Sequence, residues 1–323
     1  MRILLTGTTG QVGRALFAPL ASLGTVLSIN RSQLDLSRPE TIGEAFDHLK
    51  PDLIVNPAAY TAVDRAEDDR QLAFRVNADA PGAMAVWAAR HNVPLVHFST
   101  DYVFDGSGTA PWREDDVPAP LSAYGASKLA GENAVQAAGG EHLIVRTSWV
   151  YSNHGQNFML SMARLAEGRK ELRIVADQFG APTSARLIAD AVMKILNFSR
   201  TGPVCWFATG SNVVNIASSG ETSWHGFASA IIAGLTNRGI NVETERVVPI
   251  GTDDYPTKAR RPQNCRLDSR RLHELFGIKM LSWREALDIE LDELADFRGI
   301  SVSPVQPALV NSNDERPSLV KGS

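Results

Sequence analysis

Residues 3–13 read Ile3-Leu4-Leu5-Thr6-Gly7-Thr8-Thr9-Gly10-Gln11-Val12-Gly13, and this stretch decides the fold. Its apolar start predicts a short buried strand, and three glycines follow at the spacing G-x-x-G-x-x-G. Glycine lets the backbone turn sharply and approach a pyrophosphate, while the helix that follows offers free N–H groups and its positive dipole end. The stretch therefore predicts a strand–turn–helix unit that binds a dinucleotide. A tight turn without a ligand is the alternative, which the position after the first strand disfavours.

Short apolar runs alternate with amphipathic stretches over the first half of the chain. Strands are predicted at 3–5, 26–29, 53–55, 95–98 and 143–145, with helices near 11–23, 39–49, 67–90 and 122–138. The runs are apolar on both faces, as expected for strands buried between helices. The alternation predicts an α/β fold with a doubly wound parallel sheet of the Rossmann type, and a ligand at the carboxyl ends of its strands.

The pattern loosens after residue 150 and predicts a second, smaller unit. Helices are expected near 157–167, 184–197, 222–237 and 283–296, and short apolar runs lie at 172–175, 204–208 and 246–250. We therefore predict a dinucleotide-binding domain at 1–148 and a C-terminal α/β substrate domain at 149–297. Segments within 179–210 are expected to rejoin the first domain. Residues 210–220 are predicted to form a loop, and 298–323 a flexible tail.

Composition excludes several classes of protein. The 323 residues carry a net charge of −4, which favours no nucleic-acid partner. The two cysteines, Cys205 and Cys265, lie far apart without a CxxC spacing, so neither a zinc ribbon nor a redox motif is indicated. No run reaches the roughly 20 apolar residues of a membrane span, and the first apolar run is too short for a signal peptide. We expect a cytoplasmic protein without a membrane partner.

The end of the second predicted strand bears on cofactor choice. An acidic residue there would hold the ribose 2′-hydroxyl of NAD, whereas Asn30 and Arg31 suit a 2′-phosphate. NADPH is therefore preferred and NADH is the alternative, unless Arg31 is only a solvated loop residue. Asp35 and Leu36 are placed near the adenine, and residues 59–61 along the middle of the cofactor. The candidate cofactor-binding residues up to this point are Gly7, Gly10, Gln11, Val12, Gly13, Asn30, Arg31, Asp35, Leu36, Ala59, Tyr60 and Thr61.

Tyr124 and Lys128 lie four residues apart on a predicted helix, and thus on one face. An ammonium beside a phenol lowers the phenol pKa from about 10, which predicts that Tyr124 donates a proton at neutral pH. Lys128 can also bind the nicotinamide ribose, so both residues join the cofactor set. The preceding strand ends in Ser99-Thr100, whose hydroxyls can bind a reacting carbonyl or merely cap the strand. The order of these elements indicates a carbonyl-reducing site.

Longer blocks carry a resemblance to a known family. They are Ser99-Thr100-Asp101-Tyr102-Val103-Phe104-Asp105-Gly106, Tyr124-Gly125-Ala126-Ser127-Lys128-Leu129-Ala130-Gly131-Glu132, Arg146-Thr147-Ser148-Trp149-Val150-Tyr151, Asp177-Gln178-Phe179-Gly180-Ala181-Pro182-Thr183, Thr222-Ser223-Trp224-His225 and Arg261-Pro262-Gln263-Asn264. In this order, over residues 1 to about 296, the chain resembles dTDP-4-dehydrorhamnose reductases of the extended short-chain dehydrogenase/reductase superfamily. The resemblance implies NADPH- or NADH-dependent reduction of the C4 ketone of dTDP-4-dehydro-L-rhamnose, a step of dTDP-rhamnose and cell-surface polysaccharide biosynthesis.

The resemblance also implies residue roles. Tyr124 would protonate the developing alkoxide, Thr100 would orient the carbonyl, and Lys128 would poise Tyr124 and hold the ribose. Arg261 would meet the substrate diphosphate, where a guanidinium suits the anion. Core packing is the alternative for Trp149, and a solvated basic run for Arg261. The implied substrate-binding residues are Thr100, Asp101, Tyr102, Trp149 and Arg261.

The chain departs from the family pattern at one feature. Some members dimerise around a magnesium ion held by glutamates, but Arg14-Ala15 and Arg186 stand at the corresponding positions here. Because magnesium requires oxygen ligands, no metal site is expected, and any homodimer would lack a metal bridge.

Several other functions remain open at this stage. The nearest is a sister nucleotide-sugar 4-ketoreductase, followed by an epimerase of the same superfamily. A dehydratase would place an acidic pair beside the catalytic hydroxyl, but Asp101 is followed by Tyr102. A non-catalytic regulatory subunit that binds dinucleotide is the alternative from a different class, against which the pair Tyr124 and Lys128 argues.

Overall fold

The main sheet of the computed structural model, which describes residues 1–201 and 213–300, confirms the predicted fold class. In the described part of the chain this sheet has six strands, all parallel, in the order β10-β5-β4-β3-β1-β2. They are β1 (Arg2–Leu5), β2 (Thr25–Ser28), β3 (Leu53–Asn56), β4 (Leu95–Thr100), β5 (His142–Thr147) and β10 (Val213–Asn215). The chain leaves β1 toward β2 and returns to β3 on the other side, so a crevice opens beyond the ends of β1 and β3.

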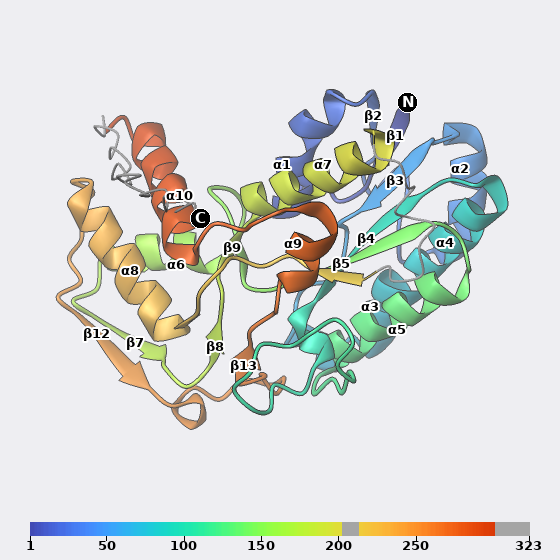
Figure 1. Ribbon diagram of the computed structural model, residues 1–323. Coiled ribbons are helices and arrows are strands. Elements are labelled where there is room, and N and C mark those ends of the chain that lie inside the picture. Colours follow the sequence, from blue (N-terminus) through green and yellow to red (C-terminus); the bar gives the residue numbers. More distant parts are fainter. Residues whose placement is uncertain (202–212, 301–323) are drawn as a thin grey trace, which may run out of the picture.

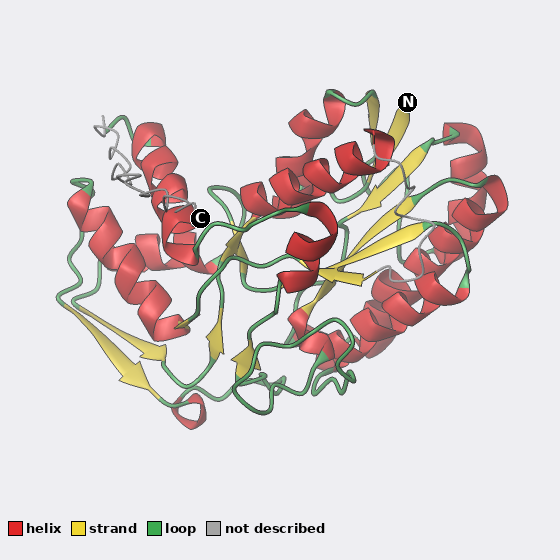
Figure 2. Cartoon of the chain, viewed as in Figure 1, coloured by secondary structure: helices red, strands yellow, loops and turns green. Residues whose placement is uncertain are grey.

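Helices cover both faces of this sheet (Figures 1 and 2). Along β1 the side chains alternate: Ile3 and Leu5 pack toward one helical layer, and Leu4 packs toward the other. Both layers remove the sheet from water, which explains the continuous apolar runs of its strands. The first layer contains α1 (Gln11–Ala21), α7 (Ala185–Thr201) and α9 (Arg270–Phe276). The second contains α2 (Ile42–Leu49), α4 (Ala80–His91) and α5 (Ala123–Ala137).

The predicted helix near 67–90 is interrupted. It consists of the 3-10 turn η2 (Arg65–Glu67), helix α3 (Arg70–Phe74), a π-helical turn η3 (Arg75–Asp79) and helix α4. Within η3, the Asn77 side chain accepts from the Tyr60 backbone N–H at 2.8 Å and donates to the Tyr60 carbonyl at 3.0 Å. A widened turn of this kind often marks a functional segment, and here it ties the helix to the chain that follows β3.

The prediction that residues 210–220 form only a loop is wrong, because β10 lies within it. Residues Val213–Asn215 pair in parallel with Ile144–Arg146 of β5. A strand of three residues among Ser, Asn and Gly has no apolar periodicity of its own. Its pairing with β5, which is far away in the sequence, decides its structure.

A second hydrophobic core lies beside the main sheet, on the left in Figure 1. It is built around Tyr151, Phe227 and Trp283 and is covered by α6 (Phe158–Ala166), α8 (Trp224–Asn237) and α10 (Trp283–Phe297). Its strands pair as β7 with β12, β8 with both β11 and β13, and β6 with β9. The bounds of these strands are β6 (Val150–Tyr151), β7 (Glu171–Val175), β8 (Phe179–Gly180), β9 (Thr183–Ser184), β11 (Thr222–Ser223), β12 (Arg246–Ile250) and β13 (Asn264–Cys265). Elsewhere in the chain, short 3-10 turns are η1 (Pro39–Thr41), η4 (Asp101–Val103) and η6 (Thr252–Asp254).

The chain crosses between the two cores more than once. Helix α7, strand β10 and helix α9 all pack with the main sheet, although each follows residue 148. The domain boundaries at 148/149 and 297/298 stay a prediction. The apolar run at 204–208 with Cys205, and residues 301–323 of the expected tail, lie outside the described residues. In the two described ranges, no helix combines the length and the apolar character that crossing a membrane requires.

Candidate active site

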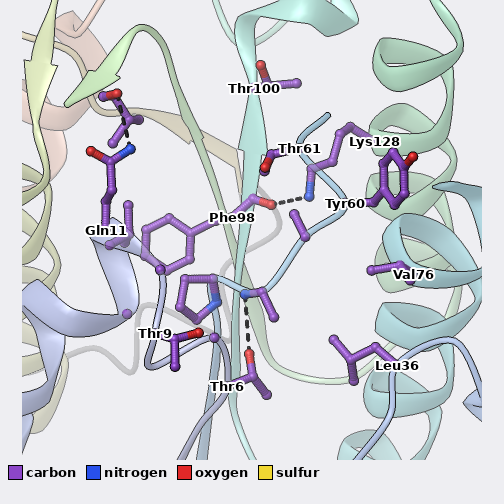
Figure 3. Close-up of a pocket in the computed structure, with 18 of the residues that line it drawn as sticks. Thr6, Thr9, Gln11, Leu36, Tyr60, Thr61, Val76, Phe98, Thr100 and Lys128 are labelled. Atoms are coloured by element: carbon purple, nitrogen blue, oxygen red, sulfur yellow. Dashed lines mark hydrogen bonds between the residues drawn. The ribbon is translucent and has the colours of Figure 1, made fainter. Parts of the chain in front are cut away.

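A cavity of about 1160 Å³ lies along the carboxyl ends of β1, β3, β4 and β5 (Figure 3). Its walls bring together residues from the glycine turn, the ends of the strands and helix α5. All of the residues predicted to bind cofactor line it: Gly7, Gly10, Gln11, Val12, Gly13, Asn30, Arg31, Asp35, Leu36, Ala59, Tyr60, Thr61, Tyr124 and Lys128. Of the predicted substrate residues, Thr100, Asp101, Tyr102 and Trp149 line it as well, and Arg261 does not.

The glycine turn has the shape that a bound pyrophosphate requires. Gly7 adopts φ +57°, and a Cβ there would lie 2.9 Å from Ala58 Cα. A Cβ on Gly13 would lie 2.1 Å from the Gly7 carbonyl oxygen. The first backbone N–H groups of an α-helix have no partner within the helix. At the start of α1 no side chain caps them, and no acidic residue occupies the first turn. This open, uncrowded helix terminus fits an anion.

Arg31 lines the end of the cavity that is formed by the chain segment following β2. Asn30 holds this turn, because its Oδ1 accepts from the Ser32 backbone N–H at 3.0 Å. The Arg31 side chain is 78% exposed, and its Nε lies 3.5 Å from Asp35 Oδ1. Figure 3 places Leu36, from the same segment, and Thr100 toward opposite ends of the cavity. The guanidinium of Arg31 therefore lies far from the hydroxyls of Thr100 and Tyr124.

Thr100 and Tyr124 present their hydroxyls to the cavity side by side. Thr100 ends β4, and its Oγ1 donates to Asp101 Oδ1 at 3.0 Å and accepts from the Tyr102 N–H at 3.2 Å. Tyr124 lies in the first turn of α5, which packs so closely on η4 that a Cβ on Gly125 would lie 2.2 Å from the Tyr102 carbonyl oxygen. Burial raises the pKa of Tyr124 to about 12, and a hydrogen bond with Thr100 acts in the opposite direction.

The prediction that Lys128 lowers the pKa of Tyr124 is wrong for this structure. The Lys128 Nζ donates to the carbonyl oxygen of Phe98 at 2.6 Å (Figure 3) and lies 3.4 Å from His97 Nε2. It is therefore turned toward β4, and burial lowers its own pKa to about 8. The phenol of Tyr124 is protonated at neutral pH, as an ordinary phenol is, and burial raises its pKa further. A protonated phenol is the form that can donate a proton.

A pair of indole rings forms another wall. Trp149 follows β5 with φ +49°, a left-handed conformation that is strained for a bulky residue. Its ring stacks on Trp224 with centroids 3.6 Å apart. Gly180 makes room for it, since a Cβ there would lie 2.8 Å from Trp149 Cε2. Trp224 also lines the cavity; sequence reasoning did not single it out, although its block belonged to the resemblance.

The remaining predicted substrate residues lie beside or behind this wall. Asp101 is buried, which raises the pKa of its carboxyl to about 6. Tyr102 OH accepts from Arg261 Nη1 at 3.3 Å, and Arg261 Nη2 pairs with Asp64 Oδ2 at 2.6 Å. Arg261 thus reaches the cavity only through Tyr102, and Asp64, which the sequence analysis missed, holds it there.

Buried hydroxyls that line the cavity supply further polar positions. Ser99 and Ser148 have no hydrogen-bond partner among the residues that the structure describes. Because unpaired buried polar groups are unfavourable, such atoms at a cavity wall point to a polar ligand.

Arg186 occupies the position discussed for the metal-linked members. Its Nε lies 3.6 Å from Glu290 Oε1, and its guanidinium also pairs with Glu293. Across residues 1–201 and 213–300, no group of three or more His, Cys, Asp or Glu side chains is arranged to hold a metal ion.

Comparisons with known proteins agree with this arrangement. Residues 1–295 match the family model described as RmlD substrate binding domain. The dTDP-4-dehydrorhamnose reductase of Burkholderia thailandensis is 47% identical over 91% of this chain and 99% of that protein. The spore coat polysaccharide biosynthesis protein SpsK of Bacillus subtilis is 36% identical over 90% of this chain and 97% of that protein.

Solved structures show the same similarity. The dTDP-4-dehydrorhamnose reductase of Bacillus anthracis, solved in complex with NADP, superposes with a TM-score of 0.82 and 32% identity, over 90% of this chain and 99% of that chain. The dTDP-4-dehydrorhamnose reductase of Clostridium acetobutylicum also gives 0.82, with 34% identity over 91% and 99% of the two chains. Sequence, fold and cavity therefore agree, and the chain belongs to the dTDP-4-dehydrorhamnose reductase family.

Proposed function

We infer that this protein reduces the C4 ketone of dTDP-4-dehydro-L-rhamnose to dTDP-L-rhamnose, with NADPH as the preferred reductant and NADH as the alternative. Family membership supports the reaction. The observation that carries it is the meeting of Thr100, Tyr124 and Lys128 with the glycine turn at one cavity. The SpsK relative is a polysaccharide biosynthesis protein, which agrees with a role in making an activated sugar for cell-surface polysaccharide.

The chemistry assigned to the side chains follows from their positions. The reduced nicotinamide, when bound, supplies the hydride that C4 receives. Thr100 orients the carbonyl oxygen, and Tyr124 donates its phenolic proton to that oxygen as negative charge develops there. Tyr124 can do so because its phenol, with a pKa of about 12, is protonated at neutral pH. Lys128, which is buried on α5, would bind the ribose hydroxyls of the cofactor.

The residues that would hold the cofactor and the substrate form two ends of the cavity. The N–H groups at the start of α1 would bind the pyrophosphate, and Arg31 the 2′-phosphate. On the substrate side, Asp101 and the Trp149 ring would contact the deoxysugar. Arg261, held behind Tyr102 by Asp64, would reach the diphosphate after exchanging that partner.

The activity is tested with purified protein, NADPH and enzymatically generated dTDP-4-dehydro-L-rhamnose, by following the reduced-nicotinamide absorbance and identifying the sugar product by NMR. We expect one dTDP-L-rhamnose per NADPH oxidised. Tyr124→Phe should reduce kcat by roughly 100-fold or more, since general acid catalysis contributes about that much. A product with the opposite configuration at C4 would indicate a sister reductase. Product without net NADPH oxidation would indicate an epimerase.

We also propose a cytoplasmic protein that forms a homodimer without a metal bridge. Arg186 stands where the metal-linked members would have a magnesium-binding glutamate, and its guanidinium pairs with Glu290 and Glu293. Light scattering after size exclusion should give the mass of a dimer both with and without EDTA. A mass that falls to that of a monomer with EDTA would contradict the proposal.

A further inference from the structure

A line of buried polar side chains runs beneath the cavity, from the chain after β3 to Lys128. The Ala58 backbone N–H donates to Thr6 Oγ1 at 3.3 Å (Figure 3), and Thr6 Oγ1 donates to Asn56 Oδ1 at 2.6 Å. Asn56 Nδ2 lies 3.1 Å from His97 Nδ1, and His97 Nε2 lies 3.4 Å from Lys128 Nζ. Each of these side chains is almost completely buried, so water does not compete for the hydrogen bonds.

The direction of this chain of hydrogen bonds follows from its first link. A backbone N–H can only donate, so Thr6 Oγ1 accepts from Ala58 and its own proton is left to donate to Asn56. The separation of 2.6 Å suits an O–H donor better than an amide N–H donor, whose usual distance is about 2.9 to 3.0 Å. The Asn56 carbonyl oxygen therefore faces Thr6, and its amide N–H₂ faces His97.

The tautomer of His97 follows in turn. Nδ1 accepts from Asn56 Nδ2, so Nδ1 carries no proton. His97 is neutral, because its complete burial holds its pKa well below the ordinary value. A neutral imidazole without a proton on Nδ1 carries it on Nε2. The Nε2–H therefore points at Lys128 Nζ.

Two donors would face each other if Lys128 were an ammonium, whereas a neutral amine can accept from Nε2–H and still donate to Phe98. Burial disfavours the ammonium as well. The groups that face Lys128 include one anion, Glu132 on α5, which raises the pKa of Lys128. Its carboxylate is bound by Arg146 of β5 in a buried ion pair of 2.6 Å, so its charge is largely compensated. Tyr124, on the same helix, is an uncharged phenol at neutral pH.

We propose that His97 is a positioning residue which presents Nε2–H to Lys128 and thereby favours the neutral amine form of the lysine in the unliganded protein, with Thr6 and Asn56 fixing the tautomer. The inference rests on the proposed function only for the role of Lys128 in the reaction. The ribose hydroxyls of a bound dinucleotide would accept hydrogen bonds from Lys128 and thereby favour the ammonium. Cofactor binding then increases the charged fraction of Lys128.

NMR of the unliganded full-length protein tests the proposal without any measurement of activity. The ¹⁵N shifts of the imidazole distinguish the two neutral tautomers, and we expect His97 in the Nε2–H form in the wild type. The ¹³Cε signal of Lys128, assigned by its loss in Lys128→Arg, should titrate well below the ordinary value of about 10.4. A His97 proton on Nδ1, or a lysine that titrates at its ordinary value, would overturn the proposal.

Two variants at Thr6, one that keeps the hydroxyl and one that is isosteric without it, separate the chain of hydrogen bonds from simple burial. Thr6→Ser keeps the hydroxyl and should leave the midpoint of Lys128 where it is in the wild type. Thr6→Val removes the donor to Asn56, so the amide can rotate, His97 can take its proton on Nδ1, and Nε2 can accept from an ammonium. The Lys128 midpoint should then rise by about one pH unit or more. Equal midpoints in both variants would show that burial alone sets the charge. Because none of these measurements uses substrate, their failure would leave the assigned reaction untouched.

Discussion

The indole rings of Trp149 and Trp224 stack with their planes inclined by 9° and their centroids 3.6 Å apart. Trp149 lies two residues after the end of β5, whereas Trp224 begins α8 and also packs on Phe158 of the second core. Trp224 Nε1 donates to Gln178 Oε1 at 3.2 Å, which fixes the angle of its ring. The stack therefore couples the end of the main sheet to the second core at the wall of the cavity.

Trp224→Ala should weaken substrate binding more than catalysis. The variant removes the ring that supports Trp149, and an aromatic pair contributes about 0.5 to 1.5 kcal/mol beyond the area it buries. We expect KM for the sugar nucleotide to rise roughly 2- to 12-fold, with kcat changed less. Steady-state kinetics at saturating NADPH measure both. Trp224→Phe, which keeps a ring in place, should show a smaller rise, and a fall in kcat at constant KM would contradict the role given to the stack.

Gly13→Ala should abolish cofactor binding. The added Cβ would lie 2.1 Å from the Gly7 carbonyl oxygen, a backbone atom that cannot move without reshaping the turn. Overpacking of this kind destabilises by about 1 to 3 kcal/mol. Denaturant unfolding measures the stability, and quenching of intrinsic fluorescence by NADPH measures the binding.

Gly43→Ala is the matched control for that variant. Gly43 lies in the first turn of α2 with open space around the position of a Cβ. Alanine is favoured over glycine in a helix by about 1 kcal/mol or less, so this variant should be slightly more stable than the wild type and bind NADPH normally. Loss of binding in both variants would show that the assay reports folding rather than the glycine turn.

Arg31→Ala should reduce the preference for NADPH over NADH. Hydrogen bonds to charged groups contribute about 1.5 to 3 kcal/mol, and the high exposure of Arg31 favours the lower end. We expect the ratio of kcat/KM for NADPH to that for NADH to fall roughly 10-fold. Arg38→Ala removes an exposed arginine that does not line the cavity and should leave the ratio unchanged. An unchanged ratio in Arg31→Ala would assign cofactor choice to another residue.

Asp101 should make stability depend on pH in mildly acid solution. Burial raises its pKa from the ordinary 3.8 to about 6, so between these values the folded state binds more protons than the unfolded state. The contribution of Asp101 to the free energy of unfolding is therefore fully present below pH 4. About 3 kcal/mol of it is lost as the pH rises through 6. Asp101→Asn keeps an oxygen for the Thr100 hydroxyl and does not titrate. Its stability relative to wild type should increase by that amount between pH 4 and pH 7 in urea unfolding, and a difference that is independent of pH would argue against the buried carboxyl.

The sheet and the cavity were predictable where local sequence decides the structure. Runs such as Leu53–Asn56 have no other way to bury both faces, and the glycines of the first turn have a local steric cause. The order of the glycine turn, Thr100 and Tyr124 along the chain was enough to place them together, because parallel strands end at one edge.

The missed features depend on contacts between distant residues. His97 sits inside an otherwise apolar strand, and only its neighbours Asn56 and Lys128, from β3 and α5, give it a role. The pKa of Tyr124 was misjudged because the motif gives the spacing of Lys128 but not where its Nζ turns. A polar residue within an apolar run was the one sequence signal that could have pointed to His97.

Within residues 1–201 and 213–300, β10 forms an edge of the main sheet, and this has a consequence for how the protein is made. Ribosomes deliver the chain from its amino terminus at about 5 to 20 residues per second, and β5 lacks this neighbour until residue 215 has emerged. During that interval one margin of the nascent sheet offers open backbone groups to any passing strand. A chaperone that shields β5 during translation would therefore raise the yield of native protein more than one that acts after release.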